Sequence, residues 1–454
     1  MKSVKKKKED KTMQLGVFKT ATEACAAATA AQKELVQKYT MEDRDRFIGS
    51  IRTKIMANME RLAQMEFDET GYGRLEDKIA KNTGAVMLSQ GTEAIPHNMY
   101  ASDKGLTVEY YAPFGVVGAV TPVTNPAATI IGNGIANVAA GNAVVFNAHP
   151  FAKKTSAETV HLVNEAITEA GGPLNLFTMA GEPTLASLDE IMVYPSVKLL
   201  VGTGGPAMVK TLMSSGKKVI AAGAGNPPSI IDETVDLKKA AEGIYGSSSF
   251  DNNLLCIAEK EIFVVDQVFD AFMKELEDAG AFRVSSEEGK KLTEICVVPS
   301  PEEGYAANKK YVGKYAKVIL KDIGIEIESD PRIVIFEAQN DDPLVQTEQM
   351  MPIIPVVRCK DFEEAMERAV IAEHDNKHSA SIWSNDINRV TAFGKRINTT
   401  IFVQNGGTMA AFGIGGSGTN APTIATPTGE GVTGPQSFVR RRRFCMAGGG
   451  NYLL

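Results

Sequence analysis

Apolar residues near the N-terminus recur at helical spacing. Residues 20–38 are rich in alanine, and the following segment repeats apolar positions every three or four residues. The apolar set of that second segment is Phe47, Ile51, Ile55, Met59, Leu62 and Met65. Because a helix completes a turn in about 3.6 residues, these positions share one face. The pattern predicts helices over Thr20–Lys38 and Met41–Glu66.

From Gly115 onward, short apolar runs alternate with helical segments. The predicted strands are Val116–Val120, Ala143–Phe146, Leu176–Met179, Val197–Val201 and Val219–Ala222. The predicted helices are Pro126–Ala140, Ser156–Ala170 and Ala207–Ser214. Buried strands that alternate with helices are typical of a parallel sheet covered on both faces. We therefore expect an α/β domain of the nucleotide-binding type over residues 16–235.

The same alternation returns after Leu237. The predicted strands are Ile262–Val265, Arg332–Phe336, Ile353–Val357, Ser379–Trp383 and Ile401–Val403. The predicted helices are Lys238–Tyr245, Phe269–Leu276, Phe362–Ile371 and Ile387–Ile397. The fold class we predict is α/β, with two Rossmann-like domains, the second spanning residues 236–428.

The two ends of the chain differ from these domains. Residues 1–15 carry the run Lys5–Lys8 with little to bury, which predicts a disordered basic tail, with a targeting or docking role left open. Residues 429–454 contain a glycine loop and then Arg440–Arg443. This segment is interpreted as a small β arm that joins a neighbouring subunit, although a solvated edge or an anion site is also consistent with it.

Composition narrows the class of protein. The 454 residues are 44% hydrophobic and 23% charged, as in ordinary globular proteins, and the net charge of −7 argues against a nucleic-acid partner. No apolar stretch reaches the length of a membrane span, so we expect an intracellular protein with no membrane partner. The five cysteines are widely spaced and the five histidines form no ligand motif, which predicts reduced thiols and no metal site.

Polar residues follow the predicted strands where a parallel sheet binds ligands. These candidates are Thr121, Pro122, Asn147, His149 and the turn formed by Gly202, Thr203, Gly204 and Gly205. The turn can bring backbone N–H groups to a pyrophosphate at a helix start, but it lacks the third glycine of the G-x-G-x-x-G fingerprint. A modified nucleotide site and an ordinary strand-to-helix turn both remain open.

One cysteine lies in a distinctive stretch, Phe250–Lys260. Cys256 follows serine and asparagine residues and precedes a strand, so the thiol is expected on a polar loop between a helix and a strand. A thiolate is the strongest nucleophile that a side chain offers near neutral pH. A small buried apolar residue is the alternative, because that is the usual role of a free cysteine.

These segments together resemble the CoA-acylating branch of the aldehyde dehydrogenase superfamily, especially its microcompartment enzymes for propionaldehyde or acetaldehyde. The resemblance covers about Gly16 to Phe444. It rests on five segments in register, namely Thr121–Pro126, Gly202–Gly205, Phe250–Lys260, Glu348–Pro352 and Pro427–Thr433.

The resemblance implies roles at matching positions. Cys256 would be the nucleophile, and Asn125 with the backbone N–H of Cys256 would form the oxyanion hole. Glu348 would contact the nicotinamide ribose, and Thr203 with Gly204 would face the pyrophosphate. Asn125 is also expected to cap the helix that starts at Pro126, and both roles are compatible.

Two departures favour the CoA-acylating branch. Hydrolytic members carry a glutamate upstream of the cysteine, whereas the matching segment Ala222–Pro228 has no carboxylate to activate water. Gly223, Ala224 and Gly225 within it would leave room for coenzyme A. Asn147 stands where hydrolytic members have a ribose-binding lysine, which favours NAD over NADP.

The predicted reaction is oxidation of a short-chain aldehyde, with propionaldehyde favoured and acetaldehyde next, by NAD and CoA to the acyl-CoA in a ping-pong sequence. The alternatives are a hydrolytic NAD-dependent enzyme and a non-catalytic nucleotide-binding scaffold. We expect a homodimer or homotetramer in the cytoplasm, inside a bacterial microcompartment, with its shell or co-encapsulated enzymes as further partners. His374 and His378 are expected at the surface.

Overall fold

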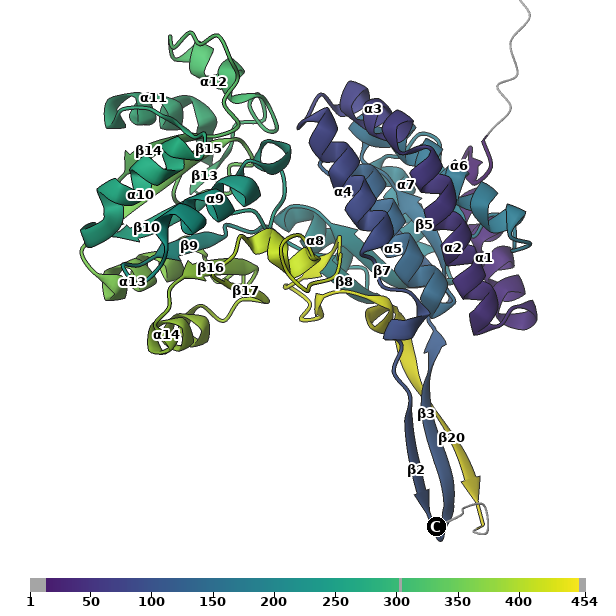
Figure 1. The fold of residues 1–454 in the computed structure, drawn as a ribbon. Helices are drawn as coiled ribbons and strands as arrows, with labels where there is room; N and C mark the ends of the chain where they lie inside the picture. The colour runs from purple at the N-terminus through teal and green to yellow at the C-terminus, as the bar shows by residue number, and fades with distance from the viewer. Residues whose placement is uncertain (1–13, 302–303, 449–454) are drawn as a thin grey trace, which may run out of the picture.

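The computed structural model describes residues 14–301 and 304–448 and shows two α/β lobes with a narrow β arm (Figure 1). The first lobe holds a six-stranded sheet of order β1-β6-β5-β4-β7-β8, and the second a seven-stranded sheet of order β11-β14-β15-β10-β9-β16-β17. Neighbouring strands in both sheets run parallel. The predicted α/β class with two parallel sheets is confirmed.

The first lobe builds its sheet from short buried strands. They are β1 (Val17–Phe18), β4 (Val116–Val120), β5 (Ala143–Asn147), β6 (Phe177–Ala180), β7 (Val197–Thr203) and β8 (Lys218–Ala222). Its helices are α1 (Ala21–Lys38), α2 (Met41–Ala57), α3 (Met59–Thr70), α4 (Leu75–Met87), α5 (Pro126–Ala140), α6 (Lys153–Glu169), α7 (Leu185–Val193) and α8 (Pro206–Met213). Every residue of α5 is buried, which explains its apolar composition.

The second lobe repeats this design. Its strands are β9 (Pro228–Ile231), β10 (Glu261–Val265), β11 (Phe282–Arg283), β14 (Val334–Ala338), β15 (Ile353–Cys359), β16 (Ser379–Trp383) and β17 (Ile401–Gln404). Its helices are α9 (Leu237–Ser248), α10 (Asp266–Asp278), α11 (Ser286–Cys296), α12 (Ala316–Asp322), α13 (Phe362–Ala372) and α14 (Ile387–Ile397). Two small antiparallel pairs accompany them, β12 (Val297–Ser300) with β13 (Gly304–Ala307), and β18 (Ile424–Ala425) with β19 (Gly431–Val432).

Three boundaries differ from expectation. The helix predicted over residues 41–66 is two helices, because Asn58 leaves the helical conformation and bonds back to Lys54 O at 2.9 Å. Strand β9 belongs to the second sheet, so that sheet begins before the expected boundary after residue 235. The arm contains β2 (Asn98–Ser102) and β3 (Gly105–Pro113) in addition to β20 (Val439–Ala447). Strand β2 is exposed along its whole length, so its sequence lacks the alternation that would reveal it.

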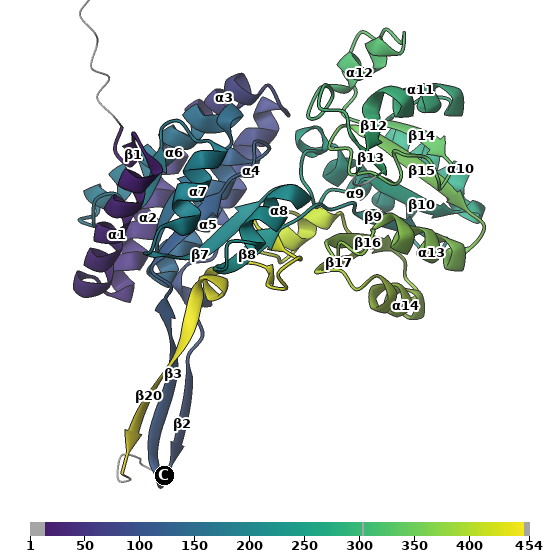
Figure 2. The same ribbon diagram turned by 180° about the vertical axis from the view of Figure 1, so that it is seen from behind.

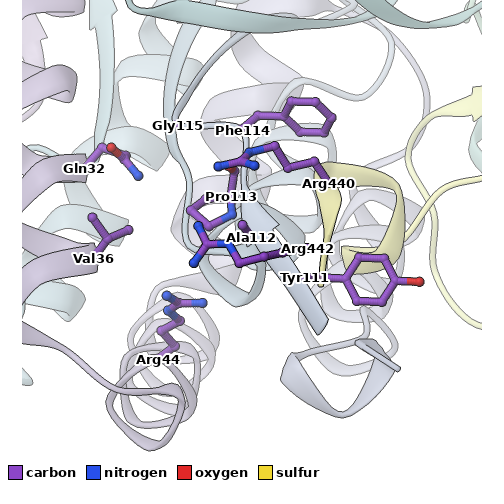
Figure 3. Close-up of a pocket in the computed structure, with 10 residues that line it drawn as sticks. All are labelled: Gln32, Val36, Arg44, Tyr111, Ala112, Pro113, Phe114, Gly115, Arg440 and Arg442. Carbon is purple, nitrogen blue, oxygen red and sulfur yellow. The ribbon is translucent and has the colours of Figure 1, made fainter. Parts of the chain in front are cut away.

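A cavity of about 420 Å³ lies at the root of the arm, between α1, the start of α2, β3 and β20 (Figure 3). Arg44, Arg440 and Arg442 line it, and its lining holds no carboxylate among the described residues. The Arg44 side chain donates to Ala139 O at 3.2 Å, which fixes one of the three guanidinium groups. Positive charge is therefore concentrated where the arm leaves the first lobe. The predicted basic tail lies mostly outside the described residues.

Candidate active site

The loop that carries Cys256 has an unusual backbone. Helix α9 ends at Ser248, a short 3-10 turn follows over Phe250–Asn253, and β10 begins at Glu261. The predicted order of helix, loop and strand is confirmed. Three consecutive residues, Asp251, Asn252 and Asn253, have φ of 50°, 55° and 61°. Asn and Asp tolerate this left-handed conformation better than other side chains with a Cβ, which explains the residue types chosen here.

Hydrogen bonds hold this loop from both lobes. The side chain of Asp251 accepts from Arg74 N at 2.9 Å, and that of Asn252 donates to Gly313 O at 3.0 Å. The Asn253 amide donates to Ser248 O at 2.8 Å and to Glu259 O at 3.0 Å. Gly73 makes the approach possible, because a Cβ there would lie 1.8 Å from an Asp251 carboxylate oxygen.

The Cys256 thiol is half-buried at the end of this loop. Burial, the larger cause, and the charge of Glu348 together raise its pKa to about 12, and the charge of Lys260 opposes both. Of the other cysteines, Cys25, Cys296 and Cys359 are buried, and Cys445 is exposed on the arm. The electrostatic surroundings thus place Glu348 and Lys260 close to Cys256.

The side chain of Lys260 forms hydrogen bonds with the backbone of the cysteine loop. Its buried ammonium donates to Asn253 O at 2.8 Å and to Leu255 O at 2.9 Å. Burial lowers its pKa to about 8, and the charges of Glu348 and Cys256 act in the opposite direction. The burial of Lys260 was not predicted from the sequence, although its place four residues after the cysteine and directly before a buried strand indicates it.

Glu348 lies on a loop that is tied to the same region. Its neighbour Gln349 donates to Lys260 O at 2.8 Å and to Ile353 O at 3.0 Å. Met350 has a φ of 49°, and its carbonyl accepts from Gly313 N at 3.0 Å. The acidic residue expected at a cofactor and the cysteine expected as nucleophile are therefore brought together.

Replacing Glu348→Gln is expected to speed alkylation of Cys256 by iodoacetamide several-fold at pH 8. The carboxylate raises the pKa of the thiol, so its removal lowers that pKa and increases the thiolate fraction, which is the reacting form. Mass spectrometry of the Cys256 peptide over time gives the rate. Glu242→Gln, at an exposed position of α9, is the control and should leave the rate unchanged. A slower rate in Glu348→Gln would contradict the electrostatic explanation.

The linker between the two sheets, residues 223–227, runs past Cys256. A Cβ on Gly225 would lie 2.7 Å from the ring of His378 and 2.9 Å from Cys256 O, so only glycine fits between them. Gly223 and Ala224 are half-buried beside it. The linker holds no carboxylate, as the sequence shows.

His378 is buried, so its expected surface position is wrong, whereas His374 is exposed as expected. Burial, with a smaller contribution from Lys260, lowers the pKa of His378 to about 4, so the ring is neutral at pH 7. Its Nδ1 lies 2.9 Å from Ser379 Oγ, and its Nε2 has no partner among the described residues. The missed signal was the position of His378 directly before the buried strand β16.

Asn125 stands at the N-cap position of α5 without capping it. Its Nδ2 lies 3.3 Å from Thr124 Oγ1, and its buried Oδ1 has no partner among the described residues. The expected capping bond is therefore not formed. The side-chain amide remains available to a ligand.

The residues expected to bind the cofactor differ in whether their polar groups already have a partner within the protein. Gly205 precedes α8 with open space beside it, and the buried Thr121 Oγ1 has no partner within the described ranges. Thr203 Oγ1 lies 3.2 Å from Thr423 Oγ1, and Gly204 N donates to Ala222 O at 3.3 Å. An open glycine turn and an unpartnered hydroxyl fit a dinucleotide.

Two of the other residues expected to bind the cofactor already form hydrogen bonds within the protein. Asn147 is buried, donates to Thr184 O at 3.3 Å and accepts from Ser187 Oγ at 2.7 Å, so its amide already holds the start of α7. His149 Nδ1 accepts from Phe151 N at 3.2 Å, and Pro122 is half-buried. The amide keeps one N–H and one lone pair for a ribose, because an asparagine side chain can form up to four hydrogen bonds.

Among the described residues, no group of three His, Cys, Asp or Glu side chains is suited to a metal ion. None of the described helices is both long enough and apolar enough to cross a membrane.

Two parallel sheets covered by helices, a cysteine on a constrained loop between the lobes and a projecting β arm define a two-lobed enzyme scaffold with a half-buried thiol at its centre. The chain belongs to the aldehyde dehydrogenase family, whose sequence profile, described as "Aldehyde dehydrogenase family", matches residues 5–424.

Individual relatives agree with this assignment. The chain is 41% identical to an acetaldehyde dehydrogenase (acetylating) of Bilophila wadsworthia, over 95% of this chain and 90% of the relative. A propionaldehyde dehydrogenase from the fucose-utilisation microcompartment of Clostridium phytofermentans is 43% identical, with a TM-score of 0.92 and coverage of 96% and 99%. The Rhodopseudomonas palustris propionaldehyde dehydrogenase with bound CoA and an acylated cysteine is 41% identical, with a TM-score of 0.92 and coverage of 95% and 98%.

Proposed function

We propose that this protein oxidises a short-chain aldehyde with NAD and coenzyme A and releases the acyl-CoA, with propionaldehyde favoured over acetaldehyde. The observation that carries the proposal is the linker at Gly225, which touches the Cys256 loop and offers no carboxylate to activate water. The acetylating and propionaldehyde-oxidising relatives support the same reaction.

In the proposed reaction Cys256 Sγ attacks the aldehyde carbon and forms a thiohemiacetal. The amide of Asn125 and the backbone N–H of Cys256 donate to the oxygen on which negative charge develops. A bound nicotinamide would accept the hydride from the thiohemiacetal carbon, and loss of the hydroxyl proton would leave a thioester on Cys256 Sγ. The thiol of CoA then attacks the carbonyl carbon of that thioester, the bond from that carbon to Cys256 Sγ breaks, the thiol proton passes to Cys256, and the acyl-CoA leaves.

The dinucleotide is proposed to bind the Gly202–Gly205 turn at the start of α8, with Thr121 close to it and Glu348 at the nicotinamide ribose. NAD is favoured over NADP because Asn147 offers no positive charge to a 2′-phosphate. We assign nucleotide binding to the first lobe and the nucleophile to the second, as the expected domains at residues 16–235 and 236–428 imply.

We further propose that the arm, residues 429–454 with β2 and β3, packs against a second copy of the chain, so that the protein forms a dimer or tetramer. The three guanidinium groups at its root suit an acidic side chain of that copy (Figure 3). A microcompartment location is supported by the origin of the Clostridium phytofermentans relative. Light scattering of the whole chain tests the oligomeric state, and co-purification with shell particles tests the microcompartment location.

The reaction is tested by its dependence on CoA. With propionaldehyde and NAD alone, we expect a burst of at most one NADH per subunit, because the thioester lacks a base that would hydrolyse it. Adding CoA should start steady NADH formation with an equal yield of propionyl-CoA, measured by liquid chromatography. Steady turnover to free propionate without CoA would indicate a hydrolytic enzyme, and the absence of any turnover would indicate a non-catalytic protein.

A further inference from the structure

A buried group of four charged residues lies where α4 meets the cysteine loop. Glu66, Lys78, Lys81 and Asp251 are at most 8% exposed. Lys81 Nζ lies 2.6 Å from Asp251 Oδ2, and Lys78 Nζ lies 3.0 Å from Glu66 Oε1. The charges of the two cations and the two anions cancel. Charged groups persist in a protein interior when they are paired in this way. Figures 1 and 2 both show α4 on the side of the first lobe that faces the second.

The two lysines differ in their hydrogen bonds. Lys81 Nζ also donates to Thr124 O at 3.1 Å, directly before Asn125 in the chain. Lys78 lies 3.7 Å from Asp251 and has no contact with residues 121–125 among the described interactions. One ammonium group therefore joins the loop that carries the cysteine to the loop that carries the oxyanion amide.

Lys81 is held in its charged form. Burial alone would lower its pKa, but Asp251 and Glu66 together raise it above its ordinary value. The positive charge, and with it both hydrogen bonds, persists over the pH range in which a dehydrogenase is assayed.

We propose that Lys81 is a positioning residue for the acyl-transfer reaction, which sets the distance between Cys256 and the amide of Asn125 by binding Asp251 and Thr124 at once. This inference rests on the proposed function, because it assigns Lys81 to the geometry of that oxyanion hole. Lys81 itself touches neither substrate nor cofactor.

The loop geometry explains why such a link is needed. Oxyanion donors act only when they lie about 2.7–3.1 Å from the developing charge. Asp251 starts a run of three left-handed residues, a conformation that persists only where its surroundings impose it. Arg74 N and Gly73 hold this run on one side, but within the described residues only Lys81 connects it to the strand end that precedes Asn125.

The test compares Lys81→Met with Lys78→Met. Both variants remove one buried charge from the same group of four, but only the first removes the hydrogen bonds to Asp251 and to Thr124. We expect Lys81→Met to lower kcat at least about tenfold, since displacements near 1 Å can cost about a hundredfold. The KM values for NAD and CoA should stay unchanged. Lys78→Met should keep kcat within about threefold of the wild type, on the same scale.

A second readout separates positioning from general damage. Alkylation of Cys256 by iodoacetamide forms no oxyanion, so its rate should be equal in the two variants, while kcat differs. Thermal unfolding measured on both proteins shows whether they lose similar stability. If Lys81→Met does not fold, Lys81→Arg retains the charge while relocating the donors, and it should fold with reduced kcat.

Equal kcat losses in the two methionine variants, or wild-type kcat in Lys81→Arg, would overturn the proposal. Wild-type turnover that persists unchanged in Lys81→Met removes the positioning role and leaves the proposed function intact. If the wild type itself shows no CoA-dependent turnover, the proposed function falls and the inference falls with it.

Discussion

Cys256→Ala is expected to lower NADH formation from propionaldehyde by at least about 10⁴-fold, because removing a covalent nucleophile leaves only binding and the oxyanion donors. The loss should appear in kcat, with NAD binding measured by fluorescence titration unchanged. No acyl adduct should form on the protein when aldehyde and NAD are added without CoA. Intact-mass spectrometry of the wild type should show that adduct once per subunit.

The matched control is Cys359→Ala. Cys359 is buried in β15, and burial raises its pKa to about 12, much as for Cys256. Both variants therefore remove a thiol of the same size that is protonated at neutral pH. Full activity in Cys256→Ala would exclude the proposed nucleophile, and a comparable loss in Cys359→Ala would show that the effect is structural.

Ala224→Glu is expected to give the protein a hydrolytic activity. Ala224 is half-buried on the linker whose next residue, Gly225, lies against Cys256 O, so a glutamate there adds the general base that the segment lacks. General bases contribute about 10²-fold to 10⁴-fold, and we expect a gain of about 10²-fold in CoA-independent turnover. Free propionate measured by chromatography is the readout.

Ala224→Gln is the control for this gain, because it has nearly the same size and no basic carboxylate. It should reduce CoA-dependent turnover as much as the glutamate does if both side chains obstruct the linker. Only the Ala224→Glu variant should release free propionate in the absence of CoA. If the two variants release equal amounts, the missing carboxylate is not what selects CoA over water.

The sequence was most informative where a pattern repeats along the chain. Strands such as β4 and β5 were found because every one of their residues is buried, and α5 because its apolar run is bounded by proline and glycine. The cysteine loop was also placed correctly, since amide-rich residues between a helix and an apolar run are typical of a turn. Local composition alone determines each of these features.

The parts that were missed depend on contacts between distant segments. His378 and Lys260 have polar side chains that the fold buries against the cysteine loop, and neither carries a periodic signal. Lys81 was not recognised because its two acceptors lie in different lobes. Asn125 does not cap α5, because its Nδ2 lies against Thr124 Oγ1 and its Oδ1 reaches no backbone N–H among the described residues.

The arm places a constraint on how the protein is synthesised. Strand β3 pairs with β20 along its length, and the bonded residues Glu109 and Arg443 are 334 positions apart in sequence. Both lobes are translated before β20 emerges from the ribosome, so each lobe can fold while the arm still lacks its third strand. Because such distant pairing is slow to close, the arm acquires its third strand only after β20 has been translated.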